Sequence, residues 1–196
     1  MKNRTWLAVT FFACLGWGIA VSQSQSSTDI CAFDRSKMLA LDEKGFDQDF
    51  TGGWRTLERE ECWLVAADLI RDYRQAKSPS SKILYWHEGQ MRAFAGQIEL
   101  AILLFETTRE PVYDSFGWNL YVDATIAFLN KDEPALLKAR AILAKFPKPE
   151  NVNLSFKDAQ GRVFQATWPP NLHVVDGFIR CFDQPYKIAY GCGTAK

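Results

Sequence analysis

The residues with the clearest chemical potential are His87 and Glu88, which are adjacent in a segment that we expect to be helical. A histidine followed by a glutamate on a helix begins the zinc protease motif, in which a second histidine one turn later completes the metal ligands. Met91 takes that place here, so the motif lacks a ligand. Adjacent helix positions also point about 100° apart, so the two side chains cannot converge on one atom. We therefore predict no metal site and no cofactor, and expect Glu88 to pair with Arg92 at the helix surface.

Nucleophilic catalysis has no local signature in this chain. The sequence contains no Gly-x-Ser-x-Gly elbow, phosphate-binding loop or dinucleotide-binding fingerprint. Only His87 and His173 could supply a histidine base. Acidic residues that could partner with them include Asp47, Asp49, Asp114 and Asp123. Their simplest interpretation is solvated turns and helix caps. We therefore predict a protein that is not an enzyme; the alternative is a small secreted hydrolase that uses His87 or His173 with an acidic partner.

The segment that carries His87 has the pattern of two helices folded back on each other. Gly89 lies in the first helix, Gly96 at the turn, and Ala101 and Phe105 in the second helix. Small residues at such positions let two helix axes approach closely. One hairpin cannot bury its own apolar face, so we expect stacked neighbours.

This segment, about residues 82–111, resembles a tetratricopeptide repeat. The family has a small residue in the middle of the first helix, a glycine at the turn, an alanine five residues later and an aromatic residue four after that. Gly89, Gly96, Ala101 and Phe105 match those positions. Tyr85 also stands at the usual aromatic position, and a proline ends the unit at position 111.

Two looser copies flank this repeat. Trp54, Trp86 and Trp118 recur at intervals of 32 residues. Three alanines, Ala67, Ala101 and Ala139, recur at intervals of 34 and 38 residues, close to the 34-residue period of the family. We therefore predict a mainly α fold of about three stacked antiparallel helix hairpins over residues 51–147. In the third hairpin, Asp132 is expected to cap the second helix and Pro134 to lie in its first turn. The alternative is an ordinary helical bundle with accidental spacing.

The N-terminus has the layout of a secretory signal peptide over residues 1–22. Lys2 and Arg4 precede an apolar run of 16 residues, from Trp6 to Val21, and a Ser/Gln stretch follows. Cleavage after residue 20 or 22 would remove the apolar run, so we expect no membrane insertion of the mature protein. We therefore predict an exported protein, periplasmic if bacterial and otherwise secreted. A retained membrane anchor and lipidation at Cys14 remain alternatives.

The chain without its signal has four cysteines and a net charge of about −2, because Lys2 and Arg4 are the only charges removed. A net charge of about −2 gives no excess of basic residues for binding nucleic acid. An even cysteine count in an exported chain favours disulfides. Of the three connectivities we prefer Cys31 with Cys62 and Cys181 with Cys192. Free buried thiols are the alternative.

Residues 23–50 are expected to form an N-terminal arm, and residues 148–196 a C-terminal appendage. Alternating apolar and polar residues over 152–156 and 162–168 predict a β-hairpin. A short helix over Leu172–Phe182 is expected next, with Asn171 as its cap, followed by an extended segment at Tyr186–Tyr190.

The resemblance implies a binding groove lined by the first helix of each hairpin. Carried onto this chain, the groove residues are Trp86, Gln90 and Phe94 in the second hairpin and Asn119 and Asp123 in the third. Such a mixture of aromatic, amide and carboxylate groups suits a peptide or protein partner. The alternative places the aromatic residues in the core.

The prediction is an exported, non-enzymatic protein-binding module, either a cell-envelope adaptor or a periplasmic inhibitor such as an immunity protein. Its oligomeric state is left open.

Overall fold

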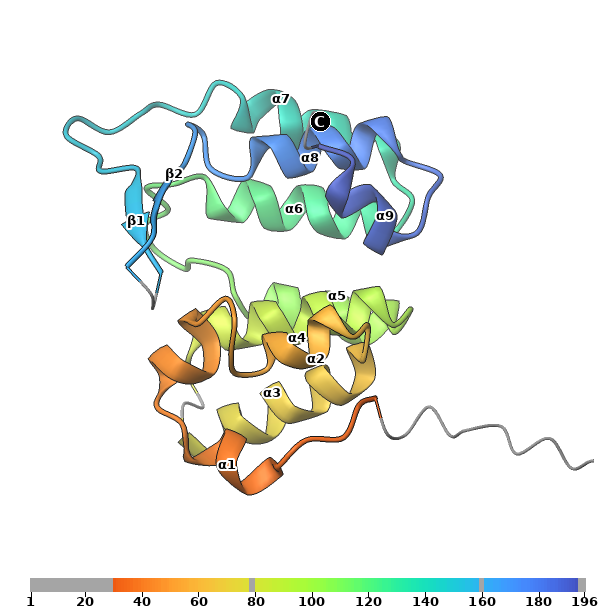
Figure 1. Ribbon diagram of the computed structural model, residues 1–196. Helices are drawn as coiled ribbons and strands as arrows, with labels where there is room; N and C mark the ends of the chain where they lie inside the picture. The colour runs from red at the N-terminus through yellow and green to blue at the C-terminus, as the bar shows by residue number, and fades with distance from the viewer. Residues whose placement is uncertain (1–29, 78–79, 159–160, 194–196) are drawn as a thin grey trace, which may run out of the picture.

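The computed structural model describes residues 30–77, 80–158 and 161–193 (Figure 1). The helices are α1 (Arg35–Ala40), the π-helix η1 (Lys44–Gln48), α2 (Arg55–Arg59), α3 (Trp63–Lys77), α4 (Lys82–Phe94), α5 (Ile98–Glu106), α6 (Trp118–Leu129), α7 (Glu133–Leu143), α8 (Leu172–Arg180) and α9 (Tyr186–Gly191). Two short strands, β1 (Ser155–Lys157) and β2 (Val163–Gln165), form an antiparallel pair. This confirms the predicted fold class. The signal-peptide prediction and Cys14 lie outside the described residues.

The predicted helix hairpins are present as consecutive packed pairs. Gly96 turns the chain between α4 and α5 with a φ of 79°, a conformation that favours glycine. Between α6 and α7, the Asp132 side chain accepts a hydrogen bond from the Ala135 amide at 3.0 Å. Pro134 lies in the first turn of α7, as expected. The likeness to tetratricopeptide repeats itself stays a prediction.

Helix α4 lies between two hydrophobic cores. Leu84 and Met91 face the core formed with η1, α2 and α3. Trp86 faces the other core, which reaches through α5, α6 and α7 to α8 and α9. At Gly89, an added Cβ would lie 2.7 Å from the Phe105 ring, so this glycine allows α5 to approach closely. The structure therefore buries α4 on opposite sides.

The polar residues of α4 are buried as well, which corrects the expected surface pair between Glu88 and Arg92. Glu88 is 2% exposed, and its carboxylate lies 2.7 Å from Arg74 and 3.5 Å from Arg92. Arg92 also reaches Asp68 at 2.6 Å. The surface prediction was wrong because α3 packs over this side of α4. Two arginines thus neutralise the carboxylate that α3 covers.

The C-terminal segment differs from its prediction in two places. Asn171 stands before α8, but its side chain makes no capping bond. Residues 186–191 form the helix α9 instead of an extended segment. Helical spacing puts Tyr186 and Ala189 on one buried face, and α9 packs beside α8 and against α4 (Figure 1). Tertiary burial therefore explains the helix.

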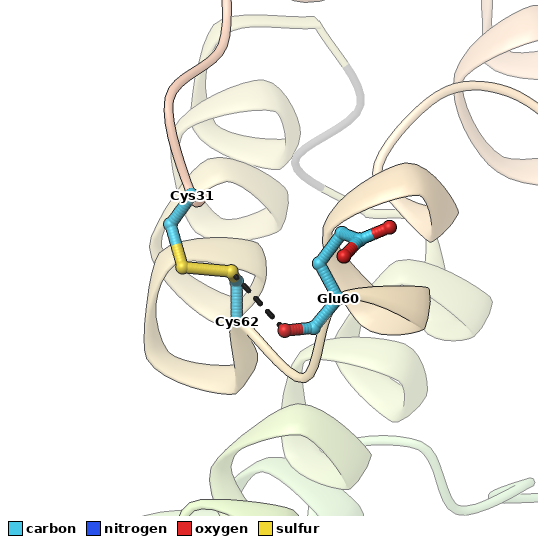
Figure 2. The surroundings of a disulfide bond; sticks show 3 residues. All are labelled: Cys31, Glu60 and Cys62. Atoms are coloured by element: carbon cyan, nitrogen blue, oxygen red, sulfur yellow. Dashed lines mark hydrogen bonds between the residues drawn. A yellow bond between two sulfur atoms is a disulfide. The ribbon is translucent and has the colours of Figure 1, made fainter. Parts of the chain in front are cut away.

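Both predicted disulfides are present. Figure 2 shows Cys31 bonded to Cys62, which ties the N-terminal arm to the start of α3, near the carbonyl oxygen of Glu60. Cys181 is bonded to Cys192 across 11 residues and closes the segment that contains α9. Each bridge fixes a peripheral segment onto the helical stack and so restricts the unfolded chain.

Gly89→Ala tests the close approach of α4 and α5. The new methyl group must displace the Phe105 ring, so we expect the free energy of unfolding to fall by about 1–3 kcal/mol. The better helix propensity of alanine offsets part of this cost. Urea denaturation measures the change, with Gly191→Ala as control because a Cβ there meets nothing within 4 Å. Equal stability of Gly89→Ala and wild type would contradict the packing.

Candidate functional site

The structure places His87 against a buried carboxylate from the N-terminal arm. Asp47 Oδ1 lies 2.6 Å from His87 Nδ1, and Asp47 is fully buried. The Trp54 indole nitrogen donates to the same oxygen at 2.9 Å, and the Gln48 amide donates to the other oxygen. The interpretation of Asp47 as a solvated residue was therefore wrong. A pair of residues 40 positions apart forms an aspartate–histidine dyad.

Three elements meet to build the dyad. Asp47 lies in η1, a wide π-helical turn of a type that is frequent at functional sites. His87 comes from α4, and Trp54 immediately precedes α2. Arg55, the first residue of α2, donates from Nε to the main-chain oxygen of Asp47 at 3.2 Å and stacks its guanidinium 4.2 Å from the Trp54 ring. The N-terminal arm is thereby joined to α4 through polar contacts.

The dyad leaves one imidazole nitrogen available. We assign the proton on Nδ1 of His87, because the neighbouring Asp47 oxygen is an acceptor. His87 Nε2 has no hydrogen-bond partner within the described ranges, and the side chain is 12% exposed. An imidazole held in this way can accept a proton from a ligand at Nε2.

The pKa values of two carboxyl groups near His87, those of Asp47 and Glu58, are shifted in opposite directions. Burial raises the pKa of Asp47, but the hydrogen bond and charge of His87, with Trp54 and Arg55, outweigh burial and hold that pKa below its usual value. Burial raises the pKa of Glu58 despite the charges of Arg55 and His87. Glu58 lies 3.7 Å from Arg55. Carboxyl groups with divergent pKa values are typical of acid–base sites.

Other parts of a catalytic centre are not found in the described residues. No hydroxyl or thiol group there hydrogen-bonds to His87. The same residues contain no cluster of histidine, cysteine or acidic side chains that could hold a metal ion. His173 is exposed in the first turn of α8 and makes no ion pair with a described residue. Within the described ranges, His87 is thus the only one of the two histidines that has an acidic partner.

Two of the predicted groove residues, Gln90 and Phe94, lie beside α9, and the third, Trp86, lies in the core against Phe105, Trp118 and Tyr121. Trp86 is 3% exposed, and its ring packs within the second core. Gln90 is also buried and lies beside Tyr186 and Tyr190, whose pKa values are raised by burial. The Phe94 ring is 5.4 Å from Tyr186 and 5.8 Å from Tyr190. In this conformation the chain's own C-terminal helix covers the face where a partner was expected.

The remaining two predicted residues lie apart from that face. The Asn119 side chain makes two hydrogen bonds of 2.9 Å to the main chain of Glu110, so it closes the loop between α5 and α6. Asp123 is exposed and pairs with Arg109 at 2.8 Å. The structure therefore does not gather the five predicted residues into one surface.

Asp123 does line a groove between α6 and α7. The groove has a volume of about 320 Å³. Its lining residues follow one stripe along each helix. They are Leu120, Asp123, Ile126 and Ala127 of α6, the cap residues Asn130 and Asp132 between the helices, Ala135, Lys138, Ala139 and Ile142 of α7, and Arg109. The small side chains of the three alanines leave space between the helices, and charged side chains of both signs also line the groove. This shape suits a side chain or helix of another molecule.

Several site residues could not be found from sequence patterns. Arg55 and Glu58 were not among the predicted residues, and Asp47 was named only as one of several acidic residues that could partner with a histidine. All three join His87 through folding, because they lie on elements other than α4. The turn-rich run around Gly52 and Gly53 was the only local hint that this part of the chain is unusual.

Comparisons with known proteins give no further guide. A scan against protein-family models, a search of curated proteins and a search of solved structures each found no match. The function of the chain must therefore be argued from its geometry.

Asp47→Asn tests the dyad. The variant keeps the side-chain shape but loses the charge, so we expect the free energy of unfolding to fall by about 1–3 kcal/mol at neutral pH. The pKa of Asp47 is lowered on folding, so its contribution is present above the unfolded value near about pH 4 and is lost as the pH falls through the folded value.

Urea denaturation between neutral and acidic pH measures this effect. The difference between wild type and Asp47→Asn should shrink below about pH 4. Asp183→Asn removes an exposed carboxylate and serves as the matched control. A difference for Asp47→Asn that stays constant into acid would argue against a stabilised carboxylate.

Proposed function

We propose that this chain is an exported, non-enzymatic protein-binding module that holds a partner protein in the groove between α6 and α7. The observation that carries the proposal is the groove itself, which is lined by apolar residues of α6 and α7 together with charged residues of both signs. A groove of this kind accepts an amphipathic helix, whose apolar residues repeat at the same spacing. The four charged groups that line it, Arg109, Asp123, Asp132 and Lys138, would fix the register of that helix.

The location of the groove suits a stable docking surface. Helix α6 packs against α5, α7 and α8, so the groove is supported by the second core. Ile142, on the α7 side of the groove, is 47% exposed, an apolar side chain that a partner could bury. A partner bound there would leave α9 in place.

Disulfide bonding supports export. The two disulfides favour an oxidising compartment. Among the residues that the structure describes, no helix is both long and apolar enough to cross a membrane. An exported binding module acts as an adaptor of the cell envelope or, if its partner is a toxin, as a periplasmic inhibitor of the immunity type.

A second candidate function is a small secreted hydrolase at the Asp47–His87 dyad. The buried carboxylate, the available His87 Nε2 and the raised pKa of Glu58 favour it. In such a site His87 would remove a proton from water and Glu58 would protonate the leaving group. We rank it second because the His87 side chain is only 12% exposed, which leaves little room for a substrate beside Nε2.

Ile142→Glu tests the groove. We expect the partner captured from the native envelope fraction by the oxidised wild-type protein to be lost, because the new charge would be buried at the interface. Leu137→Glu is the matched control, since Leu137 lies on the same helix, is 45% exposed and does not line the groove. Affinity capture with quantitative mass spectrometry measures both variants after their folding is checked. Equal loss, or equal retention, in the two variants would contradict the groove assignment.

His87→Gln separates the two functions. The binding proposal predicts that the wild-type protein hydrolyses p-nitrophenyl acetate no faster than this variant. The release of p-nitrophenol measures the rate, and His173→Gln is the control for histidine chemistry outside the dyad. A wild-type rate about a hundredfold above that of His87→Gln, retained in His173→Gln, would establish the hydrolase instead.

A further inference from the structure

The main-chain hydrogen bonds of the β-hairpin show which groups face its partner strand. The Ala166 amide donates to the Leu154 carbonyl oxygen at 2.8 Å, so these residues oppose each other in a hydrogen-bonded pair. Phe156 pairs with Phe164, two residues farther along each strand. Hydrogen-bonded and non-hydrogen-bonded pairs alternate in an antiparallel ladder. The N–H and C=O groups of Phe164 therefore point toward β1.

The intervening residues of β2 point their main-chain groups the other way. Val163 and Gln165 direct their N–H and C=O groups to the outer edge of β2, and within the described part of the chain these groups have no hydrogen-bond partner. Val163 is 62% exposed. On the opposite edge, the Ser155 amide is already bonded to the Asn153 side chain at 2.9 Å. The outer edge of β2 is thus an open template for another strand.

A cavity adjoins this open edge. Its volume is about 570 Å³, within the usual range of ligand pockets. The stacked rings of Phe156 and Phe164, with centroids 5.3 Å apart, line one side and are 48% and 37% exposed. Residues 165–167 continue the wall, and Pro170, Asn171, His173 and Gly193 close it from the side of α8. The edge and the cavity share the same strand.

The register predicts how an added strand would use both features. A residue directly opposite Phe164 on the open edge would form a non-hydrogen-bonded pair, because the main-chain groups of Phe164 are taken by β1. Its side chain would lie on the same face as Phe164, which is the face that lines the cavity. Its two neighbours in the added strand would bond to Val163 and Gln165.

We propose that the outer edge of β2 binds an extended peptide of a partner protein, which adds as a third strand and places one large apolar side chain in the cavity beside Phe156 and Phe164. Main-chain hydrogen bonds would give affinity, and the cavity would select the anchor residue. Lys157, across from Val163, makes no ion pair within the described ranges, so a peptide with a net negative charge is favoured. This site is separate from the α6–α7 groove and does not depend on it.

A blocked, fluorescently labelled peptide Glu-Thr-Val-Phe-Val-Thr-Glu is a suitable probe. Fluorescence anisotropy should show binding to the oxidised wild-type protein at concentrations below about 1 mM. Replacing the phenylalanine of the probe by alanine should weaken binding by tenfold or more, on the order expected for an aromatic anchor. A probe N-methylated on both sides of the phenylalanine cannot bond to the edge and should not bind.

Two matched protein variants locate the edge. Val163→Pro removes an outward N–H from β2, and Lys157→Pro removes the outward N–H of its cross-strand neighbour on the other edge. We expect about a tenfold loss of binding in the first variant and little loss in the second. Circular dichroism checks that both variants fold. If one of them does not fold, the N-methylated probe still tests the edge on the wild-type protein.

Three results would overturn the proposal. They are no binding of the probe to wild type, equal binding of the N-methylated probe, and equal loss in both proline variants. A dimer in analytical ultracentrifugation that only Val163→Pro dissociates would also overturn it, because the edge would then be occupied by a second copy of this chain.

Discussion

The burial of α4 on opposite sides is the constraint on which the rest of the structure depends. Its apolar residues belong to both cores, so neither half of the protein can form its core without this helix. The same constraint requires a partner for each polar side chain that α4 buries. Arg74 and Arg92 surround Glu88, and Asp47 holds His87. Because Asp47 comes from the N-terminal arm, the burial of α4 also determines where that arm lies.

A second consequence of this packing is that the protein's own helix α9 covers the face of α4 that was predicted to bind a partner. Helix α9 packs against α4 and places Tyr186 and Tyr190 beside Gln90 and Phe94. The Cys181–Cys192 disulfide closes the segment that carries α9. The two surfaces that we propose for a partner, the α6–α7 groove and the edge of β2, therefore lie outside this face. The groove is supported by packed helices, and both surfaces leave apolar side chains exposed.

Sequence patterns predicted the parts of the fold that depend on near neighbours. The turn at Gly96 and the cap at Asp132 are local, and both are present. The preferred disulfide pairing, drawn from the even cysteine count, also holds. Contacts between distant segments left no local signal. Asp47 looked like a solvated residue because its partner lies 40 positions away. Residues 186–191 looked extended because their helix is stabilised by packing against α8 and α4, which no local pattern in those residues indicates.

The central functional claim is that a partner binds on the α6–α7 groove and leaves α9 against α4. Hydrogen exchange followed by mass spectrometry, on the oxidised protein with and without its captured partner, tests this most directly. The account predicts new protection in peptides from α6 and α7 and unchanged exchange in residues 186–191. Faster exchange in α9 with new protection around Gln90 would contradict it, because the partner would then have displaced α9 and entered the face that α9 covers.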